Sequence, residues 1–81
     1  MKRDKMAAMR DRLQAEHRRL LDYIDETAGE IEVMSAGKIY SRAGAEVVRR
    51  LDVLTTAEER LSEAIAILNA AEARAEEAAA I

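Results

Sequence analysis

The residues of this chain that could carry out chemistry are few, and the first of them is a lone histidine. His17 has no second histidine and no cysteine to act with, because the sequence contains one His and no Cys. This composition excludes thiol catalysis, zinc-thiolate sites and any metal site made of several histidines. Di-iron sites in helical bundles place a Glu three residues before the His, and that position here is Gln14. We therefore predict a polar packing contact for His17, with no metal site.

Two further patterns come close to functional motifs but lack essential residues. Gly37 and Lys38 match the end of a phosphate-binding P-loop. However, Glu32 stands where the motif needs its first glycine, and Ile39 replaces the Ser or Thr that would bind Mg²⁺. The glutamates between residues 58 and 77 follow a regular helical spacing, with no concave pocket to shift their pKa values. We predict no catalytic residues, no cofactor and no enzyme activity.

A basic segment at the start of the chain suggests nucleic acid as an alternative partner. Residues 1–20 hold seven Lys or Arg against three Asp or Glu, whereas residues 21–81 hold six against thirteen. The candidate nucleic-acid contacts are Lys2, Arg3, Lys5, Arg10 and Arg12. Acidic residues interrupt this segment, and it has no aromatic side chain on which a base could stack. We favour pairing of the basic start with the acidic end of the same chain.

The composition favours helices that pack through aliphatic side chains. Hydrophobic residues make up 49% of the 81 residues, with three Gly and no Pro, Phe or Trp. In the first half, apolar residues recur at steps of three, four or seven, which is the spacing of one helical face. These residues are Met6, Met9, Leu13, Leu20, Ile24, Ile31 and Met34. The spacing predicts a helix over about residues 3–34.

The second half has a more regular, seven-residue repeat. One position of the repeat holds Val47, Leu54, Leu61, Leu68 and Ala75, and a second holds Ala57, Ala64, Ala71 and Ala78. Such a stripe is typical of bundle helices and predicts a helix over about residues 41–79. Thr55 begins a capping-box pattern, so a break near Thr55, giving a three-helix bundle, is the alternative. The repeat keeps its phase through this position, and we favour the unbroken helix.

Residues 35–40 are the natural place for the chain to reverse. Gly37 could end the first helix in a left-handed conformation. The alternating polar and apolar residues that precede it make a short β-hairpin over residues 31–42 the alternative. Together the elements predict an all-α, coiled-coil-like antiparallel two-helix hairpin that forms one domain over residues 1–81.

A reversal at residues 36–37 sets the register between the two predicted helices. It places Leu20 opposite Leu54, and it places apolar residues opposite each other along the line of contact between the two helices, which we call the seam. At one level of the hairpin the apolar stripe of each predicted helix is interrupted by a polar residue, and there His17 comes opposite Glu58. We predict that these two residues form a polar pair that sets the register.

Several apolar residues lie off the seam and need cover. A hairpin of this size buries only one seam, so further apolar side chains must pack against another chain. The predicted interface residues are Leu21, Val33, Val48, Val53, Ala57, Ala64, Ile67, Ala71 and Ala78. We predict a homo-oligomer, with a dimer favoured, that completes a four-helix bundle and also binds another protein.

These observations favour a non-enzymatic role in protein–protein interaction or assembly. The chain could serve as an adaptor, a chaperone-like hairpin or a structural subunit of a larger particle such as a phage virion. The alternative is a small nucleic-acid-associated regulator that uses the basic N-terminal helix. No apolar run approaches the roughly 20 residues that span a bilayer. We therefore predict no membrane partner and a cytoplasmic location, or a virion if the chain is phage-encoded.

Overall fold

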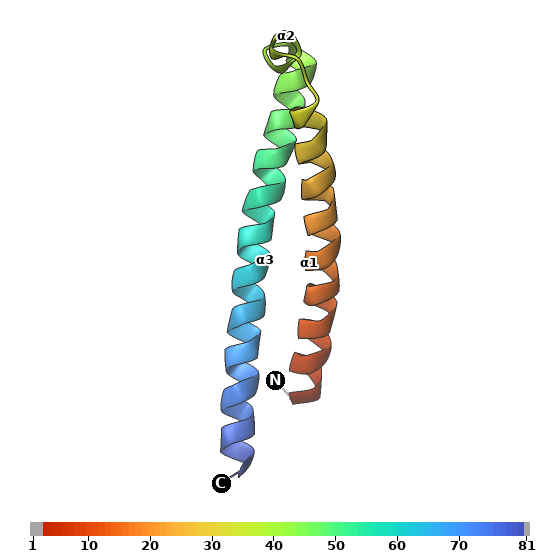
Figure 1. Ribbon diagram of the computed structural model, residues 1–81. Coiled ribbons are helices and arrows are strands. Elements are labelled where there is room, and N and C mark those ends of the chain that lie inside the picture. The colour runs from red at the N-terminus through yellow and green to blue at the C-terminus, as the bar shows by residue number, and fades with distance from the viewer. Residues whose placement is uncertain (1–2, 81) are drawn as a thin grey trace.

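The chain folds into two long helices and one short helix between them. The computed structural model describes residues 3–80, which form α1 (Arg3–Glu32), α2 (Ala36–Ile39) and α3 (Arg42–Ala80). Figure 1 shows α1 and α3 side by side, with α2 at one end and both chain termini at the other. The predicted all-α class is confirmed, since the described residues contain no strand.

Both long helices are unbroken, and in each of them a threonine hydroxyl donates to a carbonyl of the preceding turn. Thr27 is buried inside α1, and its hydroxyl donates to the Tyr23 carbonyl at 2.8 Å, so the helix itself satisfies this polar group. In α3, the Thr55 hydroxyl donates to the Asp52 carbonyl at 3.0 Å. Thr55 thus lies in an unbroken helix, and the alternative of a break near Thr55 with a three-helix bundle is wrong.

The connection between the long helices is a helical turn capped by two serines. The Ser35 hydroxyl accepts from the Lys38 backbone N–H at 3.3 Å, and the Ser41 hydroxyl accepts from the Gly44 N–H at 3.2 Å. These are the N-cap contacts that satisfy free N–H groups at a helix start. The predicted turn at 35–40 therefore contains α2, and α1 ends at Glu32, two residues earlier than expected.

Two predictions for this tip are wrong. No glycine among residues 3–80 has a positive φ, so Gly37 lies within α2 and does not end a helix in the left-handed conformation. The β-hairpin alternative over residues 31–42 also fails, because this segment contains helix and turn. Two serine N-caps are found instead, and they start α2 and α3 without unusual backbone angles.

Gly44 allows the start of α3 to pack against α2. A Cβ built on Gly44 would lie 2.8 Å from the Ile39 Cα and closer still to the Lys38 carbonyl oxygen. Only a residue without a side chain fits this approach of two backbones. Gly29 and Gly37 have no such neighbour within 4 Å. Gly44 is therefore the glycine on which the close packing of the tip depends.

The register of α1 against α3 differs from the predicted one by six or seven residues of α3, which is nearly two helical turns. Leu20 lines a groove with Leu61 rather than with Leu54. The Arg50–Glu30 ion pair, at 3.5 Å, also places partners further along α3 than a reversal at residues 36–37 allows. The reason is α2, which moves the midpoint of the reversal toward Ile39.

The packed helices leave an unusually large part of the chain in contact with solvent. The solvent-accessible surface is 6202 Å², whereas a compact monomer of 9.0 kDa exposes about 4,900 Å². The radius of gyration is 18.2 Å, against about 12 Å for a compact chain of this length. Among the side chains that the structure describes, Met6, 8% exposed, is the only buried apolar one.

Candidate protein-interaction surface

A polar cluster joins α1 to α3 near the middle of the rod. His17 Nε2 of α1 lies 2.9 Å from Glu58 Oε1 and 3.1 Å from Ser62 Oγ, both on α3. The Ser62 hydroxyl in turn donates to Glu58 Oε1 at 2.9 Å. Glu58 and Ser62 share a helix face because they are four residues apart. The structure thus brings the predicted pair of His17 and Glu58 together, and it adds Ser62, which the sequence did not single out.

The cluster contains the residue types of a hydrolytic triad but not the geometry of one. In such a triad the acid binds one imidazole nitrogen and the serine binds the other. Here Glu58 and Ser62 both contact Nε2 of His17. The arrangement instead stabilises a carboxylate, because the pKa of Glu58 is lowered, first by its hydrogen bond with His17 and then by that with Ser62. We interpret the cluster as a structural link between the helices.

The lowered pKa of Glu58 makes part of the stability dependent on pH. Because ionised Glu58 is favoured in the folded state, its contribution is present above the ordinary value of 4.5 and is lost as the pH falls through the lower folded value. We expect Glu58→Gln to unfold at lower urea concentration than the wild type at neutral pH, with the difference vanishing in acid. Urea titrations followed by circular dichroism check this, and a difference that is constant at every pH would contradict it.

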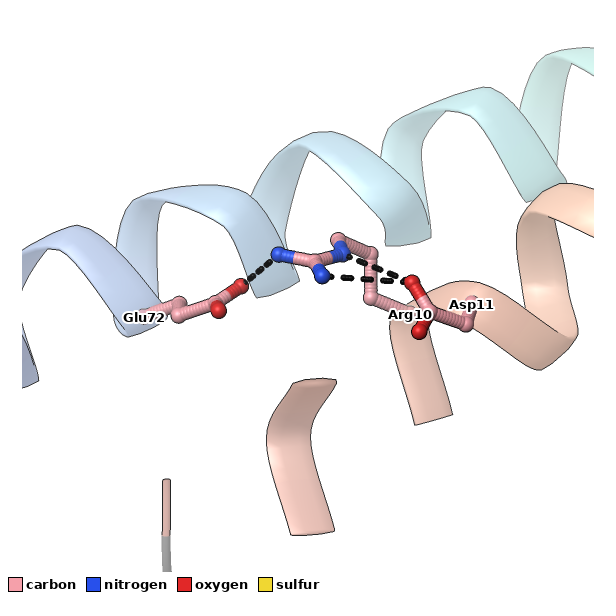
Figure 2. Close-up of polar contacts among 3 residues, drawn as sticks. All are labelled: Arg10, Asp11 and Glu72. Atoms are coloured by element: carbon pink, nitrogen blue, oxygen red, sulfur yellow. Dashed lines mark hydrogen bonds and ion pairs between the residues drawn. The ribbon is translucent and has the colours of Figure 1, made fainter. Parts of the chain in front are cut away.

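A second polar contact on the same flank engages one of the predicted nucleic-acid contacts. Figure 2 shows Arg10 of α1 between Asp11 and Glu72, and its guanidinium forms an ion pair with Glu72 of α3. The pKa of Arg10 is raised, first by the hydrogen bond to Asp11 and also by Glu72. Arg10 lies seven residues before His17, so both stand on one face of α1. Its charge is directed to the acidic half of the same chain, as the sequence analysis favoured.

The remaining candidate nucleic-acid contacts do not form a described cluster. Lys5 and Arg12 are exposed on α1. Lys2 lies outside the described residues, and Arg3 contributes only the first residue of α1. The structure therefore gives no geometry that singles out a phosphate-binding surface within residues 3–80.

The other side of the seam between α1 and α3 is a groove with mainly apolar walls. Its apolar members are Leu20 and Tyr23 of α1 and Val53, Ala57, Leu61 and Ala64 of α3, and its polar members are Glu16, Arg19, Asp52, Thr56 and Arg60. At about 100° per residue, Ile67 and Ala71 extend the same stripe of α3. We call these eight apolar residues the apolar flank. Tyr23, Val53 and Ile67 are 53%, 60% and 59% exposed, so residues 3–80 leave more than half of each uncovered.

The apolar flank contains five of the nine predicted interface residues, namely Val53, Ala57, Ala64, Ile67 and Ala71. Ala78 continues their stripe, seven residues beyond Ala71. Leu21 and Val48 are exposed elsewhere, since helical spacing places Leu21 beside His17 and Val48 beside Leu51. Val33 lies at the tip of the rod, just after α1. The nine residues thus occupy more than one surface.

The groove also contains residues that sequence reasoning did not assign to an interface. Leu20 and Leu61 were assigned to the seam, and Tyr23 was not singled out, because each helix was considered by its own stripe. Their position on the flank depends on how the second helix lies beside the first. Tyr40 lies in the tip, residues 33–42, which the sequence predicts to be exposed and available to a partner, and it is 89% exposed.

No other class of site emerges from residues 3–80. This part of the chain has no group of three or more His, Asp or Glu side chains placed to hold a metal ion. None of the helices in this part of the chain is long and apolar enough to cross a membrane. In comparisons with known proteins, the chain matches no family model, no curated protein and no solved structure.

Proposed function

We propose that this chain is a non-enzymatic interaction or assembly protein, a helical hairpin that completes a bundle by packing against another polypeptide. It would act as an adaptor, a chaperone-like hairpin or a structural subunit of a larger particle such as a phage virion. The observation that carries the proposal is the apolar flank, which the hairpin leaves exposed along much of its length.

The energetic argument rests on how little the hairpin buries alone. With Met6 as the one buried apolar side chain that the structure describes, the hydrophobic contribution to folding is small. Chains of this size already bury only about 60% of their unfolded surface when they are compact, and this rod is less compact than that. Covering the apolar flank adds the missing burial, so folding and association are linked.

The asymmetry of the hairpin supports an interaction role for one side. Two polar contacts between the helices, His17–Glu58 and Arg10–Glu72, lie on the flank that is not apolar, and a third, Arg50–Glu30, lies near the tip beside Tyr23. A surface that presents aliphatic side chains along one face and satisfied polar groups along the other is typical of a bundle helix pair with one side missing.

Dilution tests this proposal. Because association stabilises the folded chain by mass action, helicity and melting temperature should both fall as the protein is diluted. Circular dichroism at 222 nm across a dilution series measures both quantities. A chain that stays fully helical with an unchanged melting temperature throughout the series would overturn the proposal.

A further inference from the structure

The partner of the apolar flank can be inferred from the area, the side-chain sizes and the charges that this flank presents. We propose that the apolar flank binds the same flank of a second copy of this chain, antiparallel to the first, across a two-fold axis at the level of His17 and Ser62. This inference rests on the proposed function and deepens it by naming the partner.

The excess surface of the chain is larger than the area that a standard dimer interface covers on one partner. The chain exposes 6202 Å², which is about 1,300 Å² more than a compact monomer of its mass. A standard stable interface covers about 800 Å² on each partner. Burial of the apolar flank in a dimer interface of standard size would therefore remove more than half of this excess. The flank extends about 27 Å along α3, which is too long for a small ligand to cover.

The order of large and small residues on α3 fits an antiparallel copy of itself. When two α3 helices cross antiparallel at residue 62, Val53 comes opposite Ala71 of the second copy. In the same register, Ile67 comes opposite Ala57 of the second copy. Both exposed aliphatic side chains thus meet an alanine, which lets the two helices approach while their surfaces interdigitate. The exposed Arg60, which also lines the groove, comes opposite Ala64 of the second copy. Because the axis is two-fold, each pairing occurs twice.

The charges beside the flank on α1 independently favour an antiparallel copy. Arg19 and Glu16, which pair with each other at 3.3 Å, are exposed near the middle of α1. Lys5 is exposed near the start of α1, and Glu30, which pairs with Arg50 of the same chain, is exposed near its end. In an antiparallel pair centred between residues 17 and 18, Lys5 comes opposite Glu30 of the second copy, and Arg19 comes opposite Glu16 of the second copy. Opposite charges meet in both cases, which fixes the orientation of two chains more than it adds affinity.

The two helices locate the axis at the same level of the rod, although neither pattern depends on the other. The size pattern places it at residue 62 of α3, and the charge pattern places it between residues 17 and 18 of α1. In the structure, His17 Nε2 lies 3.1 Å from Ser62 Oγ, so these two positions are level with each other. One two-fold axis can therefore produce the pairings of α1 with α1 and of α3 with α3 at the same time, as an isologous dimer requires.

Spin labels at the tip test both the partner and the orientation. The wild-type chain has no cysteine, and Tyr40 is 89% exposed, so Tyr40→Cys offers a single labelling position. The tip lies about 30 Å from the proposed axis along α3, so the two labels of an antiparallel dimer should be about 60 Å apart. Double electron–electron resonance measures this distance.

Each other outcome of that experiment overturns the inference in a distinguishable way. A short distance between labels would show a parallel dimer with both tips at one end. A weakly helical chain with no dipolar coupling would overturn the dimer but leave the proposed function, because the cover would then be a different protein. A fully helical monomer would overturn both.

A matched pair of variants tests the surface itself. Ala57→Glu places a charge in the proposed interface twice per dimer, and we expect the dissociation constant of the dimer to rise by about 100-fold or more. Ala66→Glu makes the same change on an exposed residue of α3 that lies away from the flank, and we expect a change of less than about 3-fold. Sedimentation equilibrium measures both constants. Equal effects of the two substitutions would overturn the inference.

Discussion

Substitution of Gly44 by alanine should lower the free energy of unfolding by about 2 kcal/mol, because overpacking at the tip outweighs the gain in helix propensity. The new Cβ would lie 2.8 Å from the Ile39 Cα, and nearer to the Lys38 carbonyl oxygen. Both neighbours are backbone atoms, so no side chain can rotate away to make room. Relief requires α2 to move away from α3. Urea unfolding at one fixed protein concentration, followed at 222 nm, measures the change.

Gly29→Ala is the matched control for this prediction. Gly29 lies within α1, and a Cβ there would meet nothing within 4 Å. Alanine is favoured over glycine in a helix interior by about 1 kcal/mol, so this variant should be more stable than the wild type. If Gly44→Ala were stabilising by a similar amount, the close packing of α2 against α3 would not exist as described.

Substitution of Leu61 by alanine should cost about 2–3 kcal/mol of folding free energy. Leu61 is half-buried where α1 meets α3, and it lines the groove together with Leu20. Truncation removes apolar contact with α1 and, in the proposed dimer, with the second copy. Leu61→Met keeps nearly the same volume and should cost less than about 1.5 kcal/mol. Denaturant midpoints of the two variants provide the comparison, and equal losses would contradict the placement of Leu61 in the seam.

The long helices were predictable because their signal is local. The seven-residue repeat through Leu54, Leu61 and Leu68 indicates one helix face from sequence alone, and α3 follows it without a break. The Thr55 capping pattern did not end the helix, since a threonine inside a helix can return its hydroxyl to a carbonyl of the preceding turn, as Thr55 does to Asp52.

The tip was not predictable to the same degree. The short helix α2 depends on two serine caps and on the close approach of Gly44 to the backbone of Ile39, which is a tertiary contact. A tip with one helical turn also shifts the register between α1 and α3, so an error in four residues displaced the pairing along the whole seam.

The candidate surface was only partly predictable, for a related reason. The stripe of α3 from Val53 to Ala71 follows from helical spacing. Whether Leu20 and Tyr23 join that stripe depends on which side of α3 the first helix packs against, and the sequence of one helix does not contain this information. The shifted register brings Ser62 level with His17, and Glu58 still contacts His17 because it lies one turn earlier on the same face of α3.

The molar mass of the folded chain in solution tests the central claim most directly. Light scattering after size exclusion, with helicity measured on the same fractions, should give a helical species of at least twice the chain mass of 9.0 kDa. A helical species at 9.0 kDa across the micromolar range would show that the exposed flank needs no cover, and it would contradict the account.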